Sequence, residues 1–119
     1  MTPSAPSASS APPSAPFLAR CVRWAWHDNV RIDVLDERGR PAHTLDEWQT
    51  LVFHEADGQR TLAQIIAMFP TRYRDPAAIP AAYQRELTEA ARFLIEDRHW
   101  VMPRDRRNPL PEEFSEPVE

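Results

Sequence analysis

The hydrophobic pattern of this chain changes its period once, after Leu45, and that change limits the fold more than any other feature. From Arg20 to Trp26 and from Val30 to Val34, apolar and polar residues alternate, which is typical of strands with one buried face. The polar residues 27–29 between them predict a hairpin connection. Residues 41–45 predict a short third strand at a sheet edge, because the proline that begins it cannot donate to a ladder hydrogen bond.

After Leu45 the apolar residues recur at helical spacing. Asp46 predicts the N-cap of a first helix over 47–56, which Asp57-Gly58 should end. Thr61 predicts the cap of a second helix that ends before Pro70, and Pro80 predicts the start of a third helix that runs to about Asp97. The expected fold class is therefore α+β, with a small antiparallel three-stranded sheet and three helices.

Composition divides the chain into three regions. Residues 1–16 contain five Pro, five Ser and four Ala, so they cannot bury enough apolar surface to fold, and we expect a disordered arm. Residues 103–119 carry four prolines and eight charges, and we expect a flexible acidic tail in which 110–114 could serve as a short linear motif or fold back over the edge strand. The body, 17–102, holds all four tryptophans and should form one domain.

The residue types that carry catalysis or bind cofactors are scarce. The four histidines show no metal-ligand spacing, the single Cys21 excludes an internal disulfide, and two glycines are too few for a phosphate-binding loop. We therefore expect no catalytic residue, no metal and no cofactor. The N-terminal residues resemble neither a secretory signal nor a membrane anchor, so a cytoplasmic protein without membrane contact is expected.

Charge argues against nucleic-acid binding but leaves it as an alternative. The net charge is −4, and within the body eleven Arg stand against seven Asp and six Glu. Three helices next to strands would suit a winged helix that binds DNA. The expected third helix, however, mixes Gln84, Arg85 and Arg92 with four carboxylates, which phosphates would repel.

A family resemblance begins at the junction between the third strand and the first helix. Its residues are Leu45-Asp46-Glu47, then Asp57-Gly58, then Thr61-Leu62-Ala63-Gln64-Ile65-Ile66, and later Leu87 to Trp100-Val101. Over residues 20–102 the chain resembles the PqqD-like family, also called RiPP recognition elements. The resemblance implies a small winged helix-turn-helix module that is not itself catalytic.

Members of that family bind the leader segment of a precursor peptide and present the peptide to a modifying enzyme, which in pyrroloquinoline quinone biosynthesis is a radical SAM protein. The leader adds as an extra strand beside the third strand, against the last helix. The resemblance thus implies a peptide-binding adaptor with those two partners. The candidate residues are Ala42, His43, Thr44 and Leu45 on the edge strand, and Arg85, Thr88, Arg92 and Ile95 on the last helix by helical spacing.

Three other interpretations stay open. The helix residues could form a plain solvated face. The chain could be a winged-helix DNA-binding regulator, or it could be a structural subunit whose edge strand pairs with another protein or with its own copy.

Overall fold

The structure is a computed structural model that describes residues 16–118 of the 119-residue chain, so the expected arm lies outside the described residues apart from Pro16. Its elements in chain order are β2 (Phe17–Arg20), β3 (Trp24–Trp26), β4 (Ile32–Leu35), β5 (Pro41–Thr44), α1 (Glu47–Glu55), β6 (Asp57–Thr61), α2 (Leu62–Met68), η1 (Phe69–Arg72), η2 (Pro76–Ala78), α3 (Tyr83–Arg92), η3 (Phe93–Asp97), β7 (Val101–Arg104) and α4 (Glu112–Ser115).

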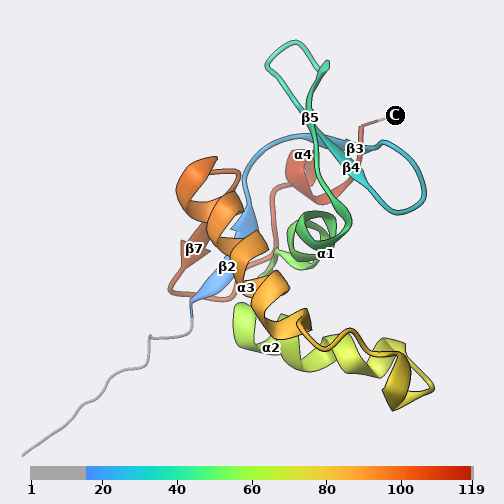
Figure 1. Ribbon diagram of the computed structural model, residues 1–119. Coiled ribbons are helices and arrows are strands. Elements are labelled where there is room, and N and C mark those ends of the chain that lie inside the picture. The colour runs from blue at the N-terminus through green and yellow to red at the C-terminus, as the bar shows by residue number, and fades with distance from the viewer. Residues whose placement is uncertain (1–15, 119) are drawn as a thin grey trace, which may run out of the picture.

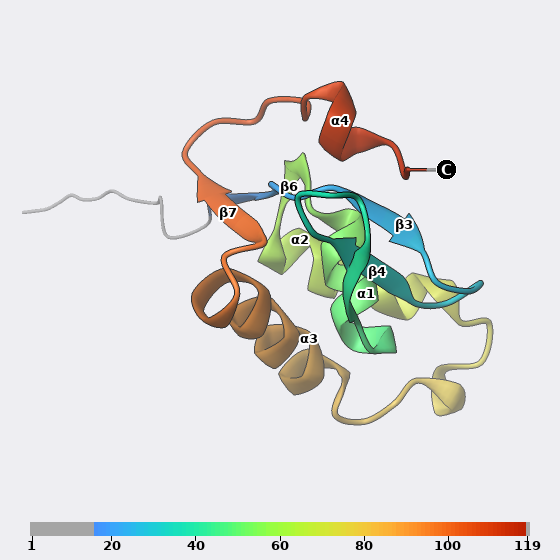
Figure 2. The same cartoon turned by 90° about the horizontal axis from the view of Figure 1, so that it is seen from above.

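The strands form two small antiparallel sheets, in the orders β6-β2-β7 and β3-β4-β5, with α1 lying between the second sheet and α3 (Figures 1 and 2). The α+β class is therefore confirmed. The described part of the chain contains four α-helices where three were expected, because the tail adds α4. In this same part no helix is long and apolar enough to cross a membrane.

The first expected strand, from Arg20 to Trp26, is two strands that belong to different sheets. The chain leaves β2 at Cys21, whose N–H donates to the carbonyl of Trp100 at 2.9 Å, and enters β3 after Arg23, whose carbonyl accepts from Leu35 at 3.0 Å. The prediction of one continuous strand was wrong because alternation shows which side is buried, but not which neighbouring strand each residue pairs with.

The second expected strand begins later than its alternation suggested. Asp28 accepts hydrogen bonds from the main-chain N–H groups of Val30 and Arg31 at 2.9 and 2.8 Å, so these residues belong to a turn and β4 starts at Ile32. Val30 is 52% exposed, although the alternating pattern placed it on the buried face.

The Asp57-Gly58 pair ends α1, as expected, but it also opens the strand β6, which was not expected. Gly58 has a φ of +81°, and β6 pairs with β2 from Phe17 opposite Thr61 to Ala19 opposite Asp57. The residues of β6 are polar, so no local hydrophobic alternation marks them. Pairing with the buried residues Leu18 and Ala19 makes this segment a strand.

Both predicted helix caps are present. Asp46 accepts from the main-chain N–H of Gln49, and Thr61 accepts from that of Gln64. In each case the glutamine side-chain oxygen accepts from the main-chain N–H of the cap residue. The third helix differs from its prediction, because α3 starts at Tyr83 rather than Pro80 and its last turn, η3, widens to a π-helix over Phe93–Asp97.

The core lies among the two sheets, α1 and α3. Its largest fully buried side chains are Trp24, Phe53, Ile32, Leu45, Ile65, Leu87, Leu94, Val34, Val52 and Val101. Burial of these apolar surfaces supplies most of the driving force for folding such a small domain.

The tail, expected to be flexible, instead returns across the sheets from β7 to α4 (Figure 2). Arg20 is only 5% exposed, and its guanidinium donates to the carbonyls of Phe114 and Ser115 at 2.8 and 3.1 Å. It also donates to the carbonyl of His54 at 2.7 Å, at the end of α1. A buried arginine with neutral carbonyl acceptors holds the tail against α1, a contact between residues 94 positions apart that no local pattern predicts.

Candidate functional site

The strand β5 lies at the edge of its sheet, which agrees with the edge position expected from Pro41. It pairs only with β4 in that sheet, with Asp33 opposite Thr44 and Val34 opposite His43. A bulge in this ladder places Leu35 opposite Pro41, so Ala42 is the extra residue on β5.

The register shows which main-chain groups of β5 are free to pair. The N–H of Leu45 donates to the carbonyl of Ile32 at 2.8 Å. Hydrogen-bonded positions alternate along an antiparallel ladder. The main-chain N–H and C=O of His43 therefore also face β4, whereas those of Thr44 point away from it. The 2.6 Å bond from Thr44 Oγ1 to Asp33 agrees, since side chains approach closely at non-hydrogen-bonded pairs.

The other sheet edges are covered or blunted. The tail bonds to β3 through the N–H of Val118, which donates to the carbonyl of Trp24 at 2.7 Å, and to β6 through Asn108, which donates to Gly58 at 3.0 Å. The strand β7 contains Pro103, which has no N–H to offer. Within residues 16–118, no segment pairs with the outer edge of β5.

An aromatic cluster, His43, Phe93 and Trp100, connects this edge to the end of the last helix. The ring of His43 lies 5.8 Å from that of Phe93 and 5.4 Å from that of Trp100, measured between centroids. The guanidinium of Arg98 lies over the rings of Phe93 and Trp100, 5.6 and 5.3 Å from their centroids. The cluster offers flat apolar surface and a cation beside the free main-chain groups of β5.

Two backbone irregularities put Trp100 in this cluster. The π-helical turn inserts an extra residue in the last helical turn, shown by the bond from the N–H of Arg98 to the carbonyl of Phe93. His99 then adopts a positive φ of 58°, which costs on the order of 1 kcal/mol for a residue with a Cβ. The N–H of Trp100 returns to the carbonyl of Leu94 at 2.9 Å, so the chain reverses into β7.

A hollow of about 350 Å³ lies between the start of α1 and α3, next to Phe93. Its charged lining consists of Asp46, Glu86, Glu89, Arg92 and Asp97. Four carboxylates against one guanidinium make this surface negative, which disfavours a nucleic-acid backbone and favours a ligand with positive charge.

The structure brings together some of the residues expected at the site and separates others. Ala42 and Thr44 are exposed and His43 is partly exposed, but Leu45 is 0% exposed and its side chain belongs to the core. Leu45 therefore has no side-chain surface to offer a peptide, and its N–H is already bonded to β4.

Of the four helix candidates, Arg92 alone lines the acidic hollow. Residues 86, 89, 90, 93 and 97 share that lining, whereas Arg85, Thr88 and Ile95 follow a neighbouring stripe of the helix. Arg85 is exposed, Ile95 packs partly against the core, and the Thr88 hydroxyl donates to the carbonyl of Gln84 at 2.8 Å. The candidates chosen by helical spacing thus follow a stripe of the helix about one residue away from the one that lines the hollow.

Sequence reasoning missed Phe93, Trp100 and the carboxylates of the hollow. A signal was present, since two aromatic residues close to the end of the last helix are available to a neighbouring strand. Their contact with His43 depends on the π-helical turn and on the positive φ of His99, neither of which has a sequence signature here.

Cys21 lies outside the site and is partly buried. Its Sγ lies 3.3 Å from the carbonyl oxygen of His99, and burial raises the pKa of the thiol. A thiol with a raised pKa stays protonated at neutral pH, which makes it a weak nucleophile.

Comparisons of the chain with protein-family models, with curated proteins and with solved structures found no match.

Proposed function

We propose that this protein is a non-catalytic peptide-binding adaptor of the winged-helix type. It captures a leader peptide or a similar partner segment as an added strand at β5 and presents that segment to a modifying enzyme. The observation that carries the proposal is the state of the sheet edges, since β3 and β6 bond to the tail and β7 contains a proline, while the main-chain groups of Thr44 point outward from β5.

The surroundings of β5 support strand addition. Pro41 and the bulge at Ala42 blunt only the start of β5, whereas Thr44 directs its main-chain groups outward next to aromatic side chains, which suits pairing. Main-chain bonds to Thr44 would supply affinity, and the cluster of His43, Phe93 and Trp100 would supply a side-chain subsite.

Two substitutions at Thr44 separate main-chain pairing from side-chain effects. Thr44→Pro removes the outward N–H without removing a bond to β4, whereas Thr44→Val keeps the N–H. Both lose the hydroxyl that donates to Asp33, so that loss is matched. Circular dichroism and thermal unfolding would verify that both variants fold.

The test uses twelve-residue peptides selected on the wild-type protein from a random displayed library. Their dissociation constants are measured by fluorescence anisotropy. We expect Thr44→Val to bind within about threefold of wild type and Thr44→Pro to bind at least about tenfold more weakly, which corresponds to loss of one main-chain hydrogen bond or more. Equal binding by the two variants would overturn the assignment of β5.

The two alternative functions predict different measurements. A DNA-binding regulator would bind a labelled duplex with an affinity that falls steeply as salt is added. A subunit that pairs through its edge would show self-association that Thr44→Pro abolishes in the absence of peptide. Either result in place of peptide binding would contradict the adaptor proposal.

A further inference from the structure

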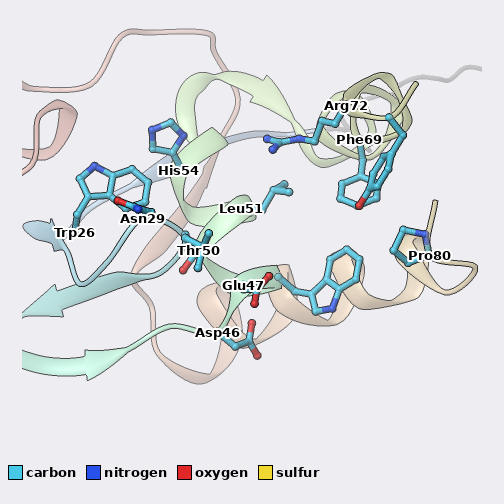
Figure 3. Close-up of a pocket in the computed structure, with 13 residues that line it drawn as sticks. Trp26, Asn29, Asp46, Glu47, Thr50, Leu51, His54, Phe69, Arg72 and Pro80 are labelled. Atoms are coloured by element: carbon cyan, nitrogen blue, oxygen red, sulfur yellow. The ribbon is translucent and has the colours of Figure 1, made fainter. Parts of the chain in front are cut away.

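A second surface, distinct from β5, is hollowed among α1, η1 and the turn between β3 and β4. This aromatic groove has a volume of about 660 Å³, and its apolar lining includes Trp26, Val30, Trp48, Leu51, Phe69 and Tyr73. Trp26 and Val30 are 44% and 52% exposed, which is high for such side chains in a small domain. In Figure 3, Trp26 and His54 stand at one end of the groove, Phe69 and Pro80 stand at the other, and Leu51 lies between them.

The aromatic rings of the groove pack against other aromatic side chains at both of its ends. Trp48 contacts Phe69 at 5.3 Å between ring centroids, and Phe69 stacks on Tyr83 at 5.1 Å. At the other end, Trp26 lies 5.6 Å from the buried Trp24 and 5.4 Å from His54. Preformed aromatic grooves of this kind recognise proline-rich segments, whose rings pack on aromatic faces and whose carbonyls accept from indole N–H groups.

The chain itself carries such a segment. Pro-Ser-Ala-Pro occurs at residues 3–6 and again at 13–16. A polyproline II helix has three residues per turn, so prolines spaced three apart lie on one side of it. Because this helix is largely formed before binding, little conformational entropy is lost when it binds. Residues 1–15 lie outside the described residues, but the length of the arm limits which of them can reach the groove.

The described chain defines the distance that the arm would have to cover. Phe17, where the arm joins β2, pairs with Thr61, and Thr61 caps α2, which leads directly to Phe69 in the groove. A strand spacing of about 5 Å and a helix of seven residues, about 10 Å long, put Phe17 roughly 15 Å from that end of the groove.

The reach of the two Pro-Ser-Ala-Pro units differs. At about 3.1 Å per residue, the ten residues from Pro6 to Pro16 can span about 31 Å, whereas the four residues from Pro13 to Phe17 can span only about 12 Å. We therefore propose that residues 3–6 of the arm bind in the aromatic groove of the same molecule. The second unit is too close to β2 to enter the groove.

The test uses the full chain and the indole N–H resonances of its four tryptophans. Pro3→Ala together with Pro6→Ala removes the proline rings that would bind, while Pro13→Ala together with Pro16→Ala is the matched control in the unit that cannot reach. We expect the first pair to shift the indole resonances of Trp26 and Trp48 and to leave that of Trp24, whose N–H is bonded to Phe114, in place. The control pair should shift none of them.

Coincident indole resonances in the wild type and the Pro3→Ala/Pro6→Ala variant would overturn the proposal. A change in the Trp26 and Trp48 resonances with protein concentration, on the order of 10 μM to 1 mM, would assign the groove to the arm of a second copy and would also overturn it, because tethering already supplies about millimolar effective concentration. Neither outcome depends on peptide binding at β5, so this inference and the adaptor proposal fail separately.

Discussion

Arg20 and Phe114 are joined by a hydrogen bond of 2.8 Å from the guanidinium Nε to the main-chain carbonyl, across 94 residues of sequence. The same carbonyl accepts from the indole N–H of Trp24 at 2.9 Å. The guanidinium also lies 5.2 Å from the Trp24 ring centroid. Burial lowers the pKa of Arg20, against the effect of nearby carboxylates led by Asp57, but it leaves the group protonated at any ordinary pH. One charged side chain thus connects β2, α1 and the tail.

Replacement of Arg20 by leucine should destabilise the fold by about 3 kcal/mol, because several buried carbonyls lose a charged donor at once. Arg20→Lys should lose less stability, since an ammonium group retains three donors. It still loses some, because it cannot reach the carbonyls at the ends of α1 and α4 at the same time. Urea unfolding followed by tryptophan fluorescence measures both. Two variants that unfold at the wild-type midpoint would show that the tail contact contributes little.

Replacement of Gly58 by alanine should release the tail from β6. A Cβ at Gly58 would collide with the main-chain oxygen of Asn108, and its positive φ adds strain of about 1 kcal/mol. Gly39 also has a positive φ but meets nothing within 4 Å, so Gly39→Ala carries the strain without the collision. Trypsin should cleave after Arg106 and Arg107 faster in Gly58→Ala than in Gly39→Ala. Equal cleavage rates would contradict the contact.

Amide hydrogen exchange should distinguish neighbouring residues on β5. The N–H of His43 faces β4 and should be protected, whereas that of Thr44 points outward and should exchange rapidly in the free protein. Two-dimensional NMR spectra recorded after transfer to D₂O report both amides. Strong protection of Thr44 in the isolated monomer would mean that another segment already covers this edge.

Leu45 should behave as a core residue rather than a contact residue. Its side chain is 0% exposed, so Leu45→Ala should cost about 3 kcal/mol of unfolding free energy through lost burial and a cavity. Thr44→Ala, at the adjacent exposed position, should cost much less. Thermal unfolding of the two variants compares them, and similar melting temperatures would contradict the burial of Leu45.

The carboxyl of Asp28 should titrate far below an ordinary aspartate. Its pKa is lowered from 3.8 to about 2, chiefly by the hydrogen bond from the main-chain N–H of Val30 and then by the Arg31 side chain. A lowered pKa in the folded state stabilises the fold above pH 3.8, and this contribution disappears as the pH falls from 3.8 toward about 2. Carbon-13 NMR titration should show the pKa rising in Arg31→Ala while it stays below 3.8, since the main-chain bonds remain.

Local patterns were sufficient for the elements that carry their own signals. Asp46 and Thr61 were identifiable as helix caps because a capping side chain bonds to the backbone three residues away. Pro41 was identifiable as the start of an edge strand because proline lacks a donor whatever surrounds it. The candidate strand could be named from sequence for the same reason, although which of its residues face outward could not.

Features that depend on distant partners were not accessible in this way. The polar strand β6 exists because it pairs with β2, and the tail is ordered because Arg20 and Gly58 supply partners for its main chain. The sequence does not show which face of α3 lines the acidic hollow, because that follows from how α1 packs against α3.

The amino-acid sequence therefore specifies the helix caps, the apolar alternation in β3 and β4 and the edge character of β5, since each depends on residues within one short segment. The division into two sheets, the outward direction of Thr44 and the meeting of His43 with Phe93 and Trp100 arise only when the chain is packed. The physical reason is that pairing register and long-range contacts are selected by the burial of the whole core, which no short segment contains.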